Sequence, residues 1–260
     1  MSLAKEVSIV ALHGFTGCGD DFFGFSEKCK LVSHWHCPNL PGHSGDIDHG
    51  ANKIMCDPAS TRVFIQNYIK EISPSPKLLL GYSMGARAAL HLALANPNNW
   101  RALILISPNP GIKNHKDRKI RRDEDHKLAN RIETEGTSSF IKRWKETPLI
   151  KSQKSIRVDW RKRMLENREQ HSSLGLATSL REFGQGSCPY LLDKLNILKM
   201  PVLILTGMSD TNYSIIASKL CERLTNAEHV PINNSGHMPH LEQPDMTSKV
   251  IDRFISKIEL

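Results

Sequence analysis

The sequence predicts an α/β fold, in which helices flank a mostly parallel central sheet and a helical cap is inserted into the second half of the chain. Three observations lead to this prediction. Short apolar runs alternate with segments of helical periodicity, one such run leads through a glycine-flanked serine into a helix, and a long charged stretch interrupts the alternation. Alternating strands and helices favour a parallel sheet that is covered on both faces.

Strands are expected where apolar and β-branched residues run together between turn-forming residues. These runs are residues 7–12, 30–35, 77–80, 102–106 and 201–205, with a weaker run at 229–232. Helices are expected at residues 61–72, 85–94 and 215–224, where apolar residues recur at helical spacing or alanine and leucine predominate. The order of these elements predicts a sheet assembled from both ends of the chain.

Residues 113–192 break this alternation, because they show helical spacing and many charges but no convincing strand. We therefore expect a helical cap over 113–192 and an α/β core formed by 1–112 together with 193–260. No linker rich in glycine, serine or proline separates the two parts, so the cap is predicted to be an insertion into one domain.

Composition places the chain among soluble globular proteins. Of its 260 residues, 39% are hydrophobic and 24% are charged. No apolar run approaches the roughly 20 residues of a membrane span. The N-terminus lacks the basic flank and cleavage pattern of an export signal, and the six cysteines form no CxxC pair. We therefore expect a cytoplasmic protein without a membrane span, a zinc site or a dense disulfide framework.

The formal net charge of +8 raises the question of a nucleic-acid partner. The basic residues concentrate between Lys113 and Arg168, within the predicted cap. No aromatic RNA-binding motif or zinc finger accompanies them, so nucleic acid is not expected as a partner. Most of these charges are interpreted as the solvated faces of helices.

A candidate nucleophile follows the third apolar run. Residues 81–85 read Gly-Tyr-Ser-Met-Gly and connect that run to an alanine-rich helix. A serine raised on a sharp strand-to-helix turn needs neighbours without side chains, and the amide that follows it lies at a helix N-terminus, where negative charge is favoured. This context predicts Ser83 as the nucleophile of an α/β-hydrolase-fold enzyme. The alternative is a serine that only shapes the turn.

A serine hydroxyl needs a base that is itself held by a carboxylate. In this fold the acid follows the serine along the chain and the histidine comes last. Asp210 follows the run at 201–205, and His237 follows a glycine just before the final helix. Asp210 and His237 are therefore the predicted partners, with a turn-forming aspartate and a surface histidine as the alternatives. His240 is the competing histidine, but no glycine precedes it.

The loop after the first apolar run, His-Gly-Phe-Thr-Gly at 13–17, stands where the fold places a second oxyanion donor. The backbone N–H groups of Phe15 and Met84 are expected to face a developing oxyanion. His13 is expected to order this loop without taking part in chemistry. His43, in the Leu-Pro-Gly-His turn at 40–43, is likewise expected to be structural.

Together these motifs resemble, over nearly the whole chain, the menaquinone-pathway family of 2-succinyl-6-hydroxy-2,4-cyclohexadiene-1-carboxylate synthases. The turns at 13–17, 40–43 and 235–237 occur across many α/β-hydrolases. More specific are Gly-Tyr-Ser-Met-Gly-Ala-Arg at 81–87, Ser-Pro-Asn-Pro-Gly-Ile at 107–112, and the segment 140–149 around Trp144.

The resemblance implies substrate-binding residues, because this family holds a substrate with several carboxylates on pocket arginines whose guanidinium groups can bind them bidentately. A purely structural role is the alternative for the cap arginines, and Arg122 could replace Arg121 if the register shifts by one. The implied substrate-binding residues are Tyr82, Arg87, Arg121, Trp144 and Arg168.

The resemblance also implies a lyase that eliminates pyruvate from a small anionic substrate, using the serine and histidine as a base, without a cofactor. The basic cap would then attract anions. Two departures stand out: Asn39 occupies a commonly acidic position, and residues 208–213 lack the lysine or arginine and the phenylalanine often found after the acid. The main alternative is a serine esterase or thioesterase, such as a pimeloyl-carrier methyl-ester esterase, whose cap would dock an acidic acyl-carrier protein. A non-catalytic binding protein is the third hypothesis, although it would be expected to lack part of the triad.

Overall fold

The computed structural model describes residues 6–43, 54–72 and 76–259. Residues 1–5, considered above for an export signal, lie outside this description. Six strands form one sheet in the order β2-β1-β3-β4-β5-β6, and every neighbouring pair is parallel. The strands are β1 (Ser8–Leu12), β2 (His34–His36), β3 (Leu78–Tyr82), β4 (Ala102–Ile106), β5 (Val202–Gly207) and β6 (Ala227–Ile232).

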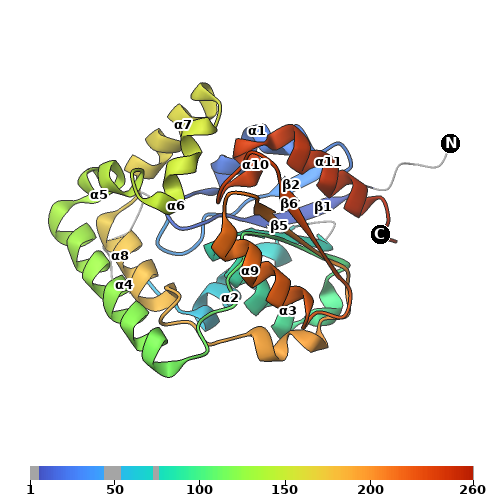
Figure 1. Cartoon of the computed structure of the whole chain (residues 1–260), viewed down its shortest axis with the longest axis horizontal. Helices are drawn as coiled ribbons and strands as arrows, with labels where there is room; N and C mark the ends of the chain where they lie inside the picture. The colour runs from blue at the N-terminus through green and yellow to red at the C-terminus, as the bar shows by residue number, and fades with distance from the viewer. Residues whose placement is uncertain (1–5, 44–53, 73–75, 260) are drawn as a thin grey trace.

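Helices connect the strands and cover the sheet (Figure 1). Those outside the insertion are α1 (Phe23–Ser26), α2 (Pro58–Lys70), α3 (Met84–Ala95), α9 (Thr211–Cys221), α10 (Pro239–Glu242) and α11 (Pro244–Ile255). Those between β4 and β5 are α4 (His115–Glu135), α5 (Thr137–Trp144), α6 (Pro148–Lys151), α7 (Val158–Glu169) and α8 (Ser173–Phe183). Short 3-10 helices lie at Gly19–Phe22, Pro97–Asn99, Ser152–Ser155 and Leu192–Ile197. The predicted α/β-hydrolase architecture is confirmed.

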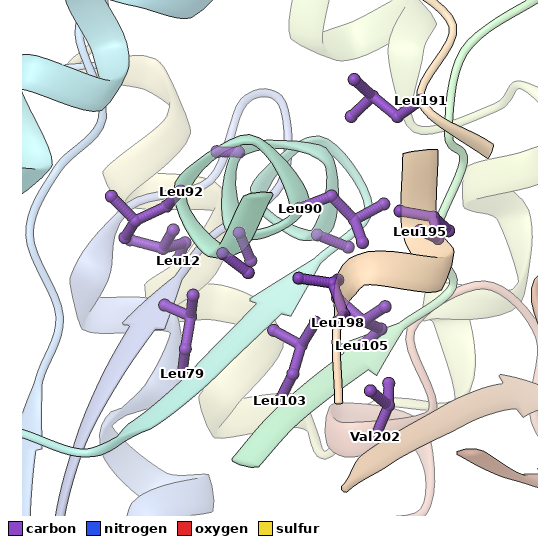
Figure 2. Packing of buried hydrophobic residues seen from close by; sticks show 14 of the residues in the cluster. Leu12, Leu79, Leu90, Leu92, Leu103, Leu105, Leu191, Leu195, Leu198 and Val202 are labelled. Atoms are coloured by element: carbon purple, nitrogen blue, oxygen red, sulfur yellow. The ribbon is translucent and has the colours of Figure 1, made fainter. Parts of the chain in front are cut away.

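The sheet is buried on both faces, which explains why β1, β3, β4 and β5 are almost entirely apolar. Side chains alternate between the faces along each strand. Leu79 packs against the layer that contains α2, α3 and α9, whereas its neighbour Leu80 packs against the layer of α1 and α11 (Figure 1). Figure 2 shows the first of these cores, where Leu90 of α3 lies above Leu103 and Leu105 of β4.

The prediction for the second strand was wrong over most of its length, because β2 begins only at His34. The amides of Lys30 and Leu31 donate to the carboxylate of Asp252 in α11, at 3.0 and 3.1 Å. The Ser33 amide donates to the carbonyl oxygen of Val7 at 2.8 Å. A contact 222 residues away along the chain therefore holds these residues in a turn.

The helices between β4 and β5 lie together beside the sheet and enclose a small apolar cluster of their own (Figure 1). Ile132 of α4, Phe140 of α5 and Leu176 of α8 belong to that cluster. The division into a core and a cap at 113 and 192 stays a prediction. Across the three described ranges, the structure contains no helix that is both long and apolar enough to cross a membrane.

Replacement of Leu80 tests the double-sided burial of the sheet. Leu80→Ala should lower the free energy of unfolding by about 2 to 5 kcal/mol, because the side chain is 0% exposed and its loss leaves a cavity. Leu31→Ala is the matched control, since Leu31 is 41% exposed and should cost less than about 0.5 kcal/mol. Urea unfolding measures both changes, and equal losses would contradict the described packing.

Candidate active site

Ser83 lies at the sharp turn between β3 and α3, with φ 52° and ψ −107°, a backbone conformation that residues other than glycine rarely adopt. The two neighbouring glycines occupy positions that have no room for a side chain. A Cβ atom at Gly81 would overlap the carbonyl oxygen of Gly85, and one at Gly85 would overlap that of Leu12. The glycines of the motif are therefore required by close packing of the backbone.

The structure brings the three predicted triad residues together. His237 Nε2 lies 3.0 Å from Ser83 Oγ, and His237 Nδ1 lies 2.7 Å from Asp210 Oδ2. With Nδ1–H donating to the carboxylate, Nε2 is free to accept the serine proton. Asp210 follows β5 and also accepts the amide of Tyr213 at 3.4 Å, which fixes the carboxylate at the start of α9. This geometry can carry a proton from Ser83 to His237.

Two residues that the sequence did not single out hold the histidine loop. The buried carboxylate of Glu242 accepts the backbone N–H groups on both sides of His237, at 2.7 and 2.9 Å, and the hydroxyl of Ser152 at 2.9 Å. The hydroxyl of Ser107 donates to the carbonyl oxygen of His237 at 2.9 Å. The position of Glu242 in the sequence is a signal for its role, because it lies only five residues beyond His237, before the final helix. Ser107 begins the segment 107–112 noted above, but that segment does not reveal its contact with His237, which is 130 residues away.

Two of the other histidines, His240 and His13, are buried in the core. His240 is 0% exposed, neither ring nitrogen has a hydrogen-bond partner among the described residues, and its ring stacks on Phe22 at 5.5 Å. Burial lowers the pKa of His240 to about 3, and that of His13 likewise to about 3. His13 Nδ1 bonds to the carbonyl oxygen of Gly14 at 2.8 Å, and its Nε2 accepts the Leu40 amide at 2.9 Å. Among the histidines that the structure describes, His237 is the one that hydrogen-bonds to Ser83.

The predicted oxyanion donors lie next to Ser83. Met84 is the first residue of α3, so its N–H has no acceptor within the helix. Phe15 follows β1 in a turn closed by a 3.0 Å hydrogen bond from the amide of Gly17 to the carbonyl oxygen of Gly14. Both Phe15 and Met84 line the cavity described next.

A cavity of about 260 Å³ opens above Ser83, between the sheet and the inserted helices; we call it the Ser83 cavity. All five predicted substrate-binding residues contribute to its wall, whereas Arg122 does not. A Cβ atom at Gly186 would overlap the backbone of Arg122, which packs away from the cavity. The residues of the cavity wall used below are Phe15, Tyr82, Ser83, Met84, Arg87, Arg121, Asp125, Trp144, Gln153, Arg168, Gln185, Tyr213 and His237.

Two arginines of the Ser83 cavity are buried without an ion-pair partner among the described residues. Arg87 is 4% exposed, and its Nη2 donates to the carbonyl oxygen of Phe183 at 2.9 Å. Arg168 is 3% exposed, and its Nη1 donates to Gln153 at 3.1 Å. Burial lowers the pKa of Arg168, although the charge of Asp21 raises it. Buried cations with only neutral partners are costly, so the cavity is suited to an anion.

The remaining predicted residues complete the wall. Arg121 differs from the other two arginines because its Nε donates to Asp125 at 2.8 Å. Trp144 packs edge-on against Phe15 at 5.8 Å, and its indole N–H has no partner among the described residues. The ring of Tyr82 lies 5.5 Å from that of His237. Within the described ranges, no three histidine, cysteine or carboxylate side chains are grouped so that they could hold a metal ion.

The chain belongs to the α/β-hydrolase fold family, which matches residues 7–244. Its relatives within that fold include 2-succinyl-6-hydroxy-2,4-cyclohexadiene-1-carboxylate synthases. A Bacillus subtilis protein assigned that activity is 30% identical over 96% of this chain and 91% of its own length. The synthase of Photorhabdus laumondii is 24% identical over 95% of this chain and 85% of its own. The resemblance drawn from the sequence is confirmed.

Solved structures agree with this family. MenH from S. aureus superposes with a TM-score of 0.90 and 28% sequence identity, covering 98% of this chain and 96% of that one. A thermophilic esterase from Thermogutta terrifontis superposes with a TM-score of 0.78 at 19% identity, covering 97% and 90%, which shows the shared fold alone. The chain is thus a synthase-like enzyme on a hydrolase scaffold.

The buried, neutral His240 predicts a pH dependence of stability. Its folded pKa of about 3 lies below the unfolded value near 6.5, so between these pH values the unfolded chain binds the extra proton. The free energy of unfolding should therefore fall by about 1.4 kcal/mol per pH unit from this residue as the pH drops from about 6.5 toward 3. In His240→Phe that contribution should vanish. Urea unfolding between pH 7.5 and 4.5 compares the slopes, and identical slopes would contradict the burial of a neutral ring.

Proposed function

We propose that this protein eliminates pyruvate from a ring precursor with several carboxylates and releases 2-succinyl-6-hydroxy-2,4-cyclohexadiene-1-carboxylate, a step of menaquinone biosynthesis. The observation that carries the proposal is the pair of buried arginines, Arg87 and Arg168, in the same cavity as Ser83 and His237. A site that cleaves neutral esters has no need of two buried cations that form no ion pair among the described residues.

The charges of the substrate match those of the cavity. The product bears one carboxylate on its ring and another on its succinyl chain, and pyruvate carries away a third. Arg87, Arg168 and Arg121 present three guanidinium groups to the Ser83 cavity. Guanidinium groups bind carboxylates through charge-assisted, frequently bidentate hydrogen bonds, and exclusion of water strengthens them. Binding would supply the anionic partners that Arg87 and Arg168 lack within the protein.

The triad can drive the elimination as a base. His237 Nε2 accepts the proton of Ser83 Oγ, and the resulting alkoxide removes the acidic proton from the ring carbon next to the succinyl carbonyl. The amides of Phe15 and Met84 stabilise the enolate oxygen that develops. When the enolate collapses, a ring double bond forms and the C–O bond to the pyruvyl group breaks. The abstracted proton remains on Ser83, the proton held by His237 passes to the departing enolpyruvate to give pyruvate, and the reaction consumes no water.

Ester or thioester hydrolysis is the second candidate function, because the turn at Ser83 and the neighbouring amides would also suit an acyl transfer. In that reaction Ser83 would attack a carbonyl carbon and form an acyl-enzyme. An acidic acyl-carrier protein would then be the partner of the basic inserted helices. The buried Arg87 and Arg168 favour the elimination over this candidate.

The proposed activity is tested directly by incubating the purified protein with the pathway precursor and measuring pyruvate release. A short-chain p-nitrophenyl ester is assayed in parallel. We expect the unmodified protein to form pyruvate. In Ser83→Ala the rate of pyruvate release should fall by about a thousandfold or more, because the proton relay is broken. Turnover of the ester without any release of pyruvate would contradict the proposal.

The role of Arg87 gives a second test. Arg87→Ala should lower kcat/KM for pyruvate release by about a hundredfold, the order expected for a lost charge-assisted hydrogen bond in a buried site. Arg101→Ala is the matched control, because Arg101 is exposed on the protein surface. Any turnover of the neutral ester should fall much less in Arg87→Ala. An equal loss on both substrates, together with a lowered melting temperature, would instead indicate a folding defect.

A further inference from the structure

We infer that Tyr213 is a positioning residue that uses Gln185 to fix Arg121 above the triad. The assignment rests on the proposed function and deepens it, because it explains how one substrate-binding arginine is held in place. Gln185 Nε2 donates to the hydroxyl of Tyr213 at 3.2 Å, and Gln185 Oε1 accepts a hydrogen bond from Arg121 Nη1 at 2.8 Å. All three residues line the Ser83 cavity.

The other side of Tyr213 contacts the triad itself. Its backbone N–H donates to Asp210 at 3.4 Å, and its ring centroid lies 4.4 Å from that of His237. Tyr213 therefore connects α9, which begins at the triad acid, with Arg121 in α4. The chain of contacts runs from the inserted helices to the catalytic base through a single glutamine.

The hydroxyl group is what the polar connection needs. A phenylalanine at position 213 could provide the ring and the amide but could not accept a hydrogen bond from Gln185. The hydroxyl of Tyr213 thus provides the contact with Gln185, while its amide and its ring contact Asp210 and His237 of the triad. Tyr213 is 8% exposed, and burial raises its pKa, so the hydroxyl stays protonated.

Arg121 needs such support more than the other two arginines do. Its side chain is 38% exposed, whereas Arg87 and Arg168 are 4% and 3% exposed as whole residues. Ordering a free arginine side chain on binding costs up to about 2 kcal/mol of conformational entropy. Asp125 holds the Nε of Arg121, and Gln185 holds its Nη1. Fixing the guanidinium from two sides before the substrate arrives reduces that cost.

A double-mutant cycle between Tyr213→Phe and Gln185→Leu tests the inference. Tyr213→Phe keeps the ring against His237, so KM for pyruvate release should rise about threefold to tenfold while kcat changes less than about twofold. The dissociation constant of the reaction product, measured by calorimetry, should rise by the same factor. In the Gln185→Leu background, Tyr213→Phe should add nothing, because the hydroxyl acts only through the amide of Gln185. Tyr190→Phe, outside the Ser83 cavity, is the matched control and should change neither quantity.

Three results would overturn the assignment. Additive effects of the two substitutions would mean that the hydroxyl of Tyr213 acts without Gln185. A fall in kcat at constant KM would place its role at His237, and unchanged constants in Tyr213→Phe would give it no role. If the unmodified protein neither releases pyruvate nor binds the product, the proposed function fails together with this inference. If the unmodified protein does both, any of the three results above rejects only the role of Tyr213 and leaves the proposed function standing. Thermal melting confirms that each variant is folded.

Discussion

The tight turn at Ser83 is the constraint on which the rest of the site depends. Its positive φ lies where the backbone is so closely packed that neither Gly81, against α3, nor Gly85, against the end of β1, can carry a side chain. The same turn leaves the amide of Met84 at the start of α3 and directs Ser83 Oγ toward His237. Strain of this kind persists only where surrounding packing enforces it, and here the fully buried strand β3 provides that packing.

The site has two layers, below and above this turn, and different interactions determine each: hydrogen bonds below it and positive charge above it. Below it, His237 is hydrogen-bonded to Asp210 and Ser107, and Glu242 accepts the amides of Gly236 and Met238 on either side, so the base is ready before any substrate binds. Above it, the inserted helices contribute the positive charge of Arg168, whose side chain hydrogen-bonds to the neutral Gln153 and forms no ion pair among the described residues. The lower layer is common to enzymes of this fold. The upper layer distinguishes a proton-abstracting lyase from an esterase, because it selects for anions.

Much of this arrangement could be predicted from the sequence, because the signals are local. The glycines around Ser83, the apolar strand before Asp210 and the glycine before His237 each report a backbone environment that only a few residue types tolerate. The sheet follows from the same apolar runs. The substrate-binding residues predicted in the inserted helices came from the resemblance to a family and not from helical periodicity.

The remainder depends on contacts between distant segments, which no local pattern encodes. Asp252 delays the start of β2 by capping amides 222 residues earlier in the chain. Gln185 is polar and lies beyond α8, so nothing in its neighbourhood reveals that it links Arg121 to Tyr213. Such residues become visible only when the helices are placed above the sheet.

The central claim is that Ser83 moves protons and never becomes acylated. Rapid chemical quenching during turnover, followed by mass spectrometry of the intact protein and of the peptide that contains Ser83, tests it most directly. The account predicts that the protein keeps its unmodified mass at every time point while pyruvate accumulates. A transient increase in mass that is located on Ser83 and decays as product forms would contradict it and would identify a covalent acyl transfer.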